Sequence, residues 1–400
     1  MLRTFAIVFH TLRQALGQRL RAAWRAAAHR ERKLLVGVDI RPFYEPLTGV
    51  GWYLYFLLHE LAKHDDVELF LFGDARVTDL GPSLHAAIPA NAHFCTFDLR
   101  GLGSPRFARP LTAAAYVAWI KIIDPDVMFG ANYFLPRLHG AVARSRVVTV
   151  HDLTYKRFPE LLQKETLDNL EAQMPRELSR ADAIICVSES TRHDLLAFYD
   201  VDPGRVFAIH SGLGTSASPA PIENLPPRYL LFVSTIEPRK NLGVLLDAFA
   251  KLRRGGYDGS LVIVGKVGWK SKEIAPRLRE PGIVHLDYLD AARLATVYQR
   301  AEAFVFPSIY EGFGFPLLEA MKFGVPAIAA RSSSLPEVGG DAALYFDPQN
   351  VDELVVQLRR VTSDTALREE LVARGHAQVA KFRWDVCAEQ TLAVLRRVAG

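Results

Sequence analysis

The sequence predicts an α/β protein made of two facing Rossmann-like domains with a cleft between them. From Leu34 onward, short apolar runs alternate with amphipathic segments, which is typical of parallel sheets flanked by helices. The alternation stops over residues 211–227, which are rich in Ser, Ala and Pro, and then restarts. A chain of 400 residues is also too long for one ordinary core. We therefore expect domains at 34–210 and 228–383, joined by a linker.

Five apolar runs predict strands in the first half, and four amphipathic segments predict helices. The strands are expected at Leu34–Val38, Glu68–Phe72, Val127–Phe129, Arg146–Val150 and Ala183–Val187. The helices are expected at Val50–Lys63, Thr112–Ile122, Leu161–Ser179 and Ser190–Phe198. Ser188 is interpreted as the cap of the last of these helices.

The second half repeats the pattern and ends in a further amphipathic segment. Strands are expected at Tyr229–Val233, Leu261–Val264, Ile283–Leu286, Ala303–Phe306, Ala327–Ala329 and Leu344–Phe346. Helices are expected near Leu242–Arg253, Leu294–Arg300, Leu317–Phe323, Val351–Val361 and, within residues 384–400, Val386–Val398. In open α/β sheets ligands bind at the carboxyl ends of the strands, so functional residues are sought in the loops there.

The positive charge is concentrated in residues 1–33. This segment has eight basic residues and one acidic residue, a net charge of +7, whereas the whole chain carries +4. The remaining chain therefore carries −3, and we expect no nucleic-acid partner. Apolar residues from Leu2 to Trp24 recur at helical spacing, so the segment is interpreted as a basic amphipathic helix. It can lie on an anionic membrane surface or pack on the protein itself.

The cysteines and the apolar runs indicate a cytoplasmic protein. Three scattered cysteines provide neither a disulfide framework nor a zinc site. No apolar run reaches the roughly 18 residues that a membrane span needs. We expect the protein in the cytoplasm, with peripheral attachment to the inner face of the cytoplasmic membrane as the alternative. Asp124-Pro-Asp126 is interpreted as a turn before a strand, so no metal site is expected.

The segment Phe306–Gly324, FPSIYEGFGFPLLEAMKFG, has the strongest functional pattern. A strand is expected to end near Phe306 and a helix to begin near Pro316, and free N–H groups at a helix start favour a phosphate. Glu311 lies in the glycine-rich loop, and Glu319 is expected in the first turn of the helix. Carboxylates accept hydrogen bonds from hydroxyl groups, so a ribose or hexose is a natural ligand. Glu319 alone would also fit a purely structural role at the helix dipole.

Three further loops occupy similar positions. Arg239 and Lys240 follow the strand Tyr229–Val233 and can bind a diphosphate. His151 and Asp152 follow the strand Arg146–Val150 directly. A loop with paired glycines, Leu47–Gly51, precedes the helix expected at Val50–Lys63 and would allow a phosphate or acceptor to approach closely.

The Glu-x7-Glu segment EGFGFPLLEAMKFGVPAIA, together with SLPEVGGDAALYFDP, resembles the retaining glycosyltransferases of family 4, which have the GT-B fold. The resemblance extends over nearly the whole chain from Lys33. It implies catalytic roles for Glu311, at the transferred sugar, for His151, and for Arg239 and Lys240, at the leaving diphosphate. It also implies a donor-binding set of Gly49, Gly51, Asp152, Gly312, Phe313, Gly314, Phe315, Leu317 and Glu319.

The resemblance further implies a metal-independent enzyme that uses a nucleotide-sugar donor and no cofactor. STIEPRKN resembles a subgroup with bacterial mannosyltransferases of surface-polysaccharide and lipopolysaccharide synthesis, so GDP-mannose is the favoured donor. A saccharide or a polyprenyl-diphosphate-linked saccharide is the expected acceptor. Many members have Gly-Arg where this chain has Ser234-Thr235, so one expected cation is missing or supplied elsewhere. The C-terminal helix is expected to cross back to the first domain, as in the family.

Three other interpretations remain open on the sequence. A sugar-nucleotide 2-epimerase has the same two facing domains, although the EGFGFPLLE segment resembles transferases better. Glycogen phosphorylase-like chemistry would need a pyridoxal lysine in a recognisable setting. A non-catalytic nucleotide-sugar-binding scaffold would bind the donor without turnover. Separate product and binding measurements distinguish these possibilities.

Overall fold

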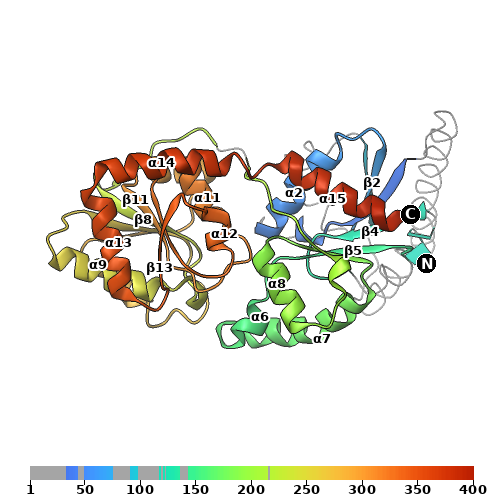
Figure 1. Ribbon diagram of the computed structural model, residues 1–400, viewed down its shortest axis with the longest axis horizontal. Helices are drawn as coiled ribbons and strands as arrows, with labels where there is room; N and C mark the ends of the chain where they lie inside the picture. The colour runs from blue at the N-terminus through green and yellow to red at the C-terminus, as the bar shows by residue number, and fades with distance from the viewer. Residues whose placement is uncertain are drawn as a thin grey trace.

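The computed structural model describes residues 33–43, 49–74, 91–97, 117–118, 120–121, 123–135, 143–214 and 217–400. Within them, two parallel sheets with flanking helices form two lobes that lie side by side (Figure 1). The predicted α/β class with two Rossmann-like units is confirmed. The N-terminal amphipathic helix, and most of the helix expected at Thr112–Ile122, fall outside the described residues.

The first lobe has a seven-stranded sheet of order β3-β2-β1-β4-β5-β6-β7, in which every pairing is parallel. Its strands are β1 (Leu34–Asp39), β2 (Val67–Asp74), β3 (Ala92–Phe97), β4 (Val127–Gly130), β5 (Arg146–Val150), β6 (Ala183–Cys186) and β7 (Val206–Ala208). Its helices are α2 (Gly49–Leu61), α6 (Thr154–Arg157), α7 (Lys164–Arg180) and α8 (Glu189–Phe198). The two strands that the pattern did not predict, β3 and β7, are the two edges.

The second lobe has a six-stranded parallel sheet of order β10-β9-β8-β11-β12-β13. Its strands are β8 (Tyr229–Val233), β9 (Ser260–Val264), β10 (Ile283–Leu286), β11 (Ala303–Phe306), β12 (Ala327–Ala330) and β13 (Ala343–Phe346). Its helices are α9 (Leu242–Arg254), α10 (Ala291–Gln299), α11 (Phe315–Lys322), α12 (Leu335–Gly339), α13 (Val351–Ser363) and α14 (Thr365–Val379).

The helices form where the apolar period is strong, and α9 illustrates this. Leu242, Leu245, Leu246, Phe249 and Leu252 recur at three- and four-residue steps, and all are buried. The pattern did not predict α14, because its buried residues are Leu371, Gly375 and Gln378, a set with too little apolar character to mark a face. Helix α12 was also missed, because its five residues are too few to show a period.

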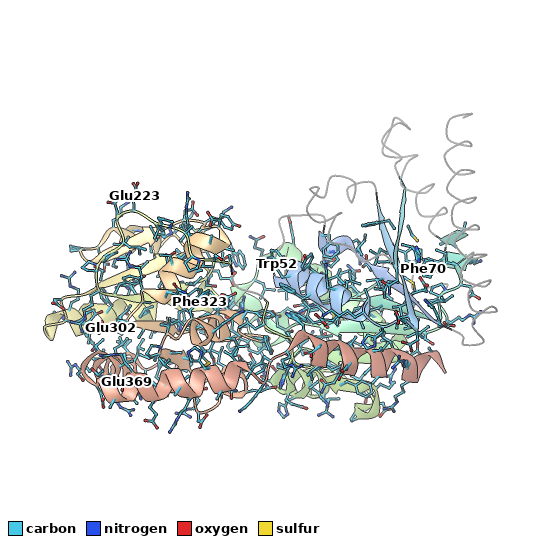
Figure 2. All side chains as sticks on the ribbon, turned by 90° about the horizontal axis from the view of Figure 1, so that it is seen from above. Trp52, Phe70, Glu223, Glu302, Phe323 and Glu369 are labelled. Carbon is cyan, nitrogen blue, oxygen red and sulfur yellow. The ribbon has the colours of Figure 1, made fainter. Side chains whose placement is uncertain are left out.

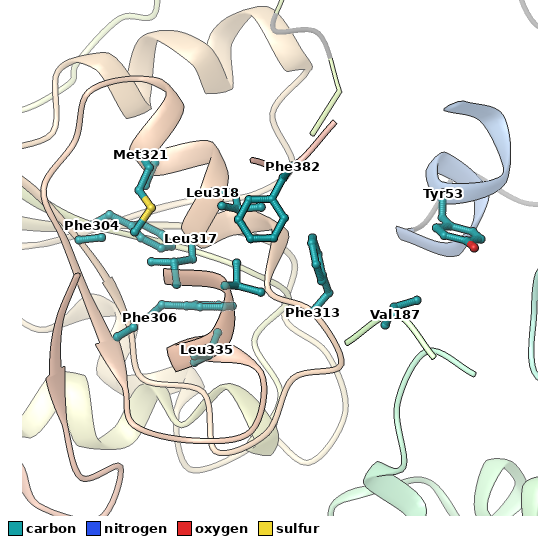
Figure 3. Packing of buried hydrophobic residues seen from close by; sticks show 14 of the residues in the cluster. Tyr53, Val187, Phe304, Phe306, Phe313, Leu317, Leu318, Met321, Leu335 and Phe382 are labelled. Atoms are coloured by element: carbon teal, nitrogen blue, oxygen red, sulfur yellow. The ribbon is translucent and has the colours of Figure 1, made fainter. Parts of the chain in front are cut away.

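The apolar core continues from one lobe into the other. A single cluster of buried side chains includes residues of both sheets, and at the junction Phe313 and Phe382 face Val187 and Tyr53 (Figure 3). The Phe313 and Phe382 ring centroids lie 5.6 Å apart in an edge-to-face arrangement. Burial of these side chains stabilises the contact between the lobes.

The chain crosses between the lobes twice. Residues 211–214 and 217–227 contain neither helix nor strand, and the Leu213 amide donates to the Phe382 carbonyl at 3.1 Å. After α14 the chain returns, and α15 (Trp384–Ala399) packs against α2 of the first lobe (Figure 1). The Trp384 and Phe56 rings stack there at 5.4 Å. Two adjacent crossings therefore tie the lobes together on one side.

Side chains cover both lobes densely, with Trp52 on α2 at the end nearest the second lobe (Figure 2). Among the described helices, none is both long enough and apolar enough to cross a bilayer.

Candidate active site at the junction of the lobes

The centre of the candidate site is a buried carboxylate between two cations. Lys240 Nζ donates to Glu311 Oε1 at 2.5 Å, and Arg239 donates to Glu311 Oε2 at 2.8 Å. Glu311 and Lys240 are each 7% exposed. Arg239 also donates to Glu237 Oε1, at 2.9 Å. The sequence predicted Glu311 on one loop and Arg239 and Lys240 on another, and the structure brings the two loops into direct contact.

Sheet topology explains why these residues meet. Strands β8 and β11 are parallel neighbours, so their carboxyl ends lie side by side. Arg239 and Lys240 follow β8 in a short 3-10 helix, Pro238–Lys240, and the Glu311 loop follows β11. The Ile309 amide donates to the Arg239 carbonyl at 2.9 Å, which holds the two loops in register.

Glu311 and its two cationic neighbours shift one another's pKa values. Burial raises the pKa of Glu311, but the positive charges of Arg239 and Lys240 outweigh burial and lower that pKa to about 2. Burial alone would lower the pKa of Arg239, and the Glu311 charge reverses that effect and raises it. Burial lowers the pKa of Lys240, partly offset by Glu311. The carboxylate is therefore ionised at neutral pH, next to two donors suited to an anion.

The donor loop, which we define as residues 310–314, is held from both lobes. From its own lobe, Ser333 Oγ accepts from the Glu311 amide at 2.8 Å, and Ser334 Oγ lies 2.9 Å from the Glu311 and Phe313 carbonyls. From the first lobe, Ser188 Oγ donates to the Gly312 carbonyl at 2.7 Å. Ser188 is also the cap of α8, as predicted, because it accepts from the Thr191 amide. Its bond to the donor loop was not predicted, because it joins residues 124 positions apart.

His151 lies across the junction from this loop. A Cβ atom added at Gly312 would come within 1.7 Å of the His151 carbonyl oxygen, so only glycine permits this approach. The His151 ring donates from Nε2 to the Ala131 carbonyl at 2.7 Å. Burial lowers the pKa of His151, although the Ala131 bond and the Asp152 charge partly oppose this. The imidazole is therefore neutral at pH 7 and oriented by the backbone.

Asp152 is the second polar group at this edge of the first sheet. Its Oδ1 accepts from the Thr154 amide at 3.0 Å. Burial raises the pKa of Tyr133, and the adjacent Asp152 charge raises it further. Tyr133 lies in the loop that follows β4, and its ring centroid is 6.0 Å from that of His151. Sequence reasoning missed Tyr133, because no motif marks the end of β4.

Helix α11 begins at Phe315, ahead of the start expected near Pro316, and Glu319 therefore lies in its second turn. Gly314, with φ 107°, directly precedes the helix, and no side chain of the described residues caps this end. The prediction that Glu319 lies in the first turn is therefore wrong. The Tyr298 hydroxyl donates to Glu319 Oε2 at 3.0 Å, and burial raises the pKa of Glu319. Glu319 is thus half-buried, with its carboxylate held by Tyr298.

The remaining predicted donor-binding residues differ in what they can contribute. Leu317 is 0% exposed and Phe313 5%, so these side chains belong to the core and only their backbones can face a ligand. Phe315 is half-buried beside Phe313, with ring centroids 5.0 Å apart. Gly49 and Gly51 lie in the first turn of α2, and Gly49 is exposed. In the described part of the chain, no recorded hydrogen bond joins that turn to the donor loop.

The models of two protein families together match most of the chain. Residues 47–217 match Glycosyltransferase Family 4, and residues 217–378 match Glycosyl transferases group 1. O-antigen chain mannosyltransferase B of Escherichia coli is 33% identical over 378 residues, which cover 88% of this chain and 96% of that protein. The chain belongs to glycosyltransferase family 4. A second relative, the serotype-specific mannosyltransferase WbdA of Escherichia coli, is 31% identical over 52% of this chain and 28% of that longer protein.

Solved structures of similar fold agree with the GT-B architecture of this glycosyltransferase. Sucrose-phosphate synthase from Thermosynechococcus elongatus superposes with a TM-score of 0.68 and 21% identity, covering 92% of this chain and 99% of that one. HepE of Anabaena, solved with UDP and glucose, also gives a TM-score of 0.68, with 18% identity over 91% of this chain and all of that one. The GT-B prediction is confirmed.

Proposed function

We propose that this glycosyltransferase transfers mannose from GDP-mannose, with retention of configuration, to a saccharide or polyprenyl-diphosphate-linked saccharide in surface-polysaccharide synthesis. The observation that carries the proposal is the buried cluster of Glu311, Arg239 and Lys240 facing His151 across the lobe junction. The names of the two Escherichia coli relatives support mannose as the sugar and O-antigen-type polysaccharide as the product. They favour a transferase over a 2-epimerase.

The cluster is suited to stabilise a departing diphosphate. The bond from the anomeric carbon to the β-phosphate oxygen breaks, and its electron pair goes to the nucleoside diphosphate. Arg239, Lys240 and the amide groups at the start of α11 would stabilise that developing charge, with no metal or other cofactor in our proposal. Glu311 keeps both cations in place until the donor binds.

The acceptor reacts on the face that the leaving group vacates. Its hydroxyl oxygen forms the new bond to the anomeric carbon, and its proton moves to the departing phosphate oxygen. This front-side reaction retains the configuration and needs no carboxylate nucleophile. The neutral His151 imidazole would contact the sugar, and Glu319 would accept from the ribose hydroxyls of the nucleotide.

The first test is a thermal-shift series with GDP-mannose, GDP, UDP-glucose, UDP-GlcNAc, UDP and dTDP-rhamnose, each with EDTA and with magnesium. A ligand at about 100 times its dissociation constant stabilises the fold by about 2.7 kcal/mol. We expect stabilisation by GDP-mannose and GDP in EDTA. Stabilisation by UDP compounds alone would overturn the donor assignment.

Product analysis tests the reaction itself. With a saccharide acceptor we expect a new glycoside that keeps the anomeric configuration of the donor. An isomerised sugar nucleotide formed without acceptor would instead indicate an epimerase, and donor binding without any turnover a scaffold.

We also propose that the enzyme works in the cytoplasm and that residues 1–33 contact the membrane surface. The charge of +7 on this segment supports the proposal, because an anionic bilayer attracts basic amphipathic segments. Co-sedimentation of the full chain with phosphatidylglycerol vesicles, but not with phosphatidylcholine vesicles, is the expected result. Equal binding to both, or to neither, would contradict it.

A further inference from the structure

One face of the helix that begins after Ser188 contacts the donor loop of the opposite lobe. Ser188, Thr191 and Asp194 are spaced three residues apart, and their exposed fractions are 0%, 1% and 4%. Both hydroxyl groups lie within hydrogen-bond distance of the Gly312 carbonyl, at 2.7 and 3.3 Å. The Tyr310 hydroxyl donates to Asp194 Oδ2 at 2.6 Å. Buried side chains of α8 and of its cap thus bind Tyr310 and Gly312, the residues on either side of Glu311.

A residue of the second lobe also contacts the start of α8. Glu337 of α12 accepts from the Glu189 amide at 2.7 Å and from the Ser190 amide at 3.0 Å. Its carboxylate therefore satisfies free N–H groups at the positive end of α8. His210, at the start of the segment that joins the lobes, contacts the same carboxylate. These bonds fix α8 against the second lobe in one orientation.

The donor loop therefore has two sets of restraints that differ in origin. Bonds from Ser333 and Ser334 come from its own lobe and persist whatever the distance between the lobes. Bonds from α8 exist only while the lobes are in contact. The second set thus links the geometry around Glu311 to the apposition of the lobes.

We infer that α8 is a positioning element for the transfer step, and that Ser188, Thr191 and Asp194 set the donor loop in its reactive arrangement only when the lobes are together. The inference rests on the proposed function, because it assigns the donor to this loop. Donor affinity then depends mainly on the second lobe, whereas turnover depends on both. A small displacement of the reacting groups is enough to slow a transfer reaction. Loss of the Ser188 or Thr191 hydroxyl is therefore expected to lower turnover.

The test compares variants of the two sets of restraints in the full chain. We expect Ser188→Ala and Thr191→Val to lower kcat about tenfold while the KM for GDP-mannose and the Kd for GDP stay within about twofold. Ser188→Thr keeps the hydroxyl and is expected to restore kcat. Ser334→Ala, on the second-lobe side, is expected to weaken GDP binding instead.

A matched control separates positioning from stability. Ser188→Ala also removes a helix cap, and Asn350→Ala removes a comparable cap, because the Asn350 side chain accepts from the Glu353 amide at the start of α13. Asn350→Ala should therefore lower the unfolding midpoint similarly and leave kcat unchanged. Hydrogen exchange of the unliganded protein adds a readout that needs no reaction: donor-loop amides should exchange faster in Ser188→Ala and Thr191→Val, but not in Asn350→Ala.

The outcomes distinguish this inference from the proposed function. Unchanged donor-loop exchange in both α8 variants would overturn the inference, even if no substrate were turned over. So would a loss of GDP affinity matching that of Ser334→Ala, because α8 would then act on binding. If wild type binds no GDP and transfers no mannose, the proposed function fails, and the exchange experiment still decides the role of α8.

Discussion

The two lobes present chemically different edges to the shared junction. The second lobe contributes a buried charged cluster in which Glu311 is paired with Arg239 and Lys240. The first lobe contributes an imidazole and one carboxylate, Asp152: burial keeps the His151 imidazole uncharged, and its ring packs against Tyr53 at 5.1 Å. Both edges are the carboxyl ends of parallel strands, so the fold alone does not create the difference.

The two edges suit different parts of the proposed reaction. A departing diphosphate gains charge and needs fixed cations, whereas the sugar and acceptor hydroxyls need hydrogen-bonding groups. The Asp152 charge of the first lobe complements this arrangement, because it raises the pKa of Arg239 on the second lobe. The comparison leads to four expectations, which follow from the largest effect to the smallest.

The largest effect is expected in the charged cluster. Glu311→Ala and Lys240→Ala should each lower kcat by about 100-fold or more, because they remove or disorder groups that stabilise the leaving diphosphate. Steady-state kinetics measures the effect, with circular dichroism to check the fold. Near-normal turnover in both variants would break the assignment of chemistry to the second lobe.

Glycines on the two lobes form a matched pair for the next test. Gly312→Ala would place a Cβ 1.7 Å from the His151 carbonyl, so we expect the junction to separate and kcat to fall more than about tenfold. A Cβ added at Gly49 meets no atom of the described residues within 4 Å, so we expect the free energy of unfolding of Gly49→Ala to stay within about 0.5 kcal/mol. A large loss of donor affinity in a stably folded Gly49→Ala variant would show that a ligand occupies the open space.

Acid should destabilise the first edge before the second. The pKa of His151 is lowered from 6.5, so the unfolded state binds more protons than the folded state as pH falls below that value, and stability falls with it. The pKa of Glu311 is lowered from 4.5 to about 2, so its contribution is lost only below about pH 4.5.

Urea unfolding between about pH 7.5 and pH 5 measures this difference. His151→Gln should flatten the dependence of the unfolding free energy on pH in that range. A wild-type unfolding free energy that rose on acidification would contradict the assignment of a neutral buried imidazole.

The smallest effect is expected at a second contact between the lobes, which comes from the loop that follows β9. Trp269 donates from its indole nitrogen to the Leu161 carbonyl at 2.9 Å, but 36% of the residue is exposed. We expect Trp269→Ala to lower the free energy of unfolding by about 1 kcal/mol and to change kcat by less than about threefold. A loss as large as that of Gly312→Ala would show that this contact, and not α8, aligns the lobes.

The local pattern predicted most strands and helices because each buries one continuous apolar face. It missed β3 and β7, which are sheet edges, and α14, whose buried face includes Gly375 and Gln378. It also placed the start of α11 near Pro316, whereas the helix begins at Phe315, directly after the left-handed Gly314. These errors arise where packing against the rest of the lobe, and not the local apolar period, determines whether a strand or helix forms and where it begins.

The sequence by itself determined the chemistry that is available: a glutamate in a glycine-rich loop, two adjacent cations, and a histidine after a buried strand. Tertiary structure decided which of these groups meet. The pairing of Glu311 with Lys240 follows from the order of β8 and β11 in the sheet, and the Ser188 bond to Gly312 follows from the apposition of the lobes. The physical reason is that local periodicity reports which face of a segment is buried, whereas contacts between distant segments depend on how whole sheets pack.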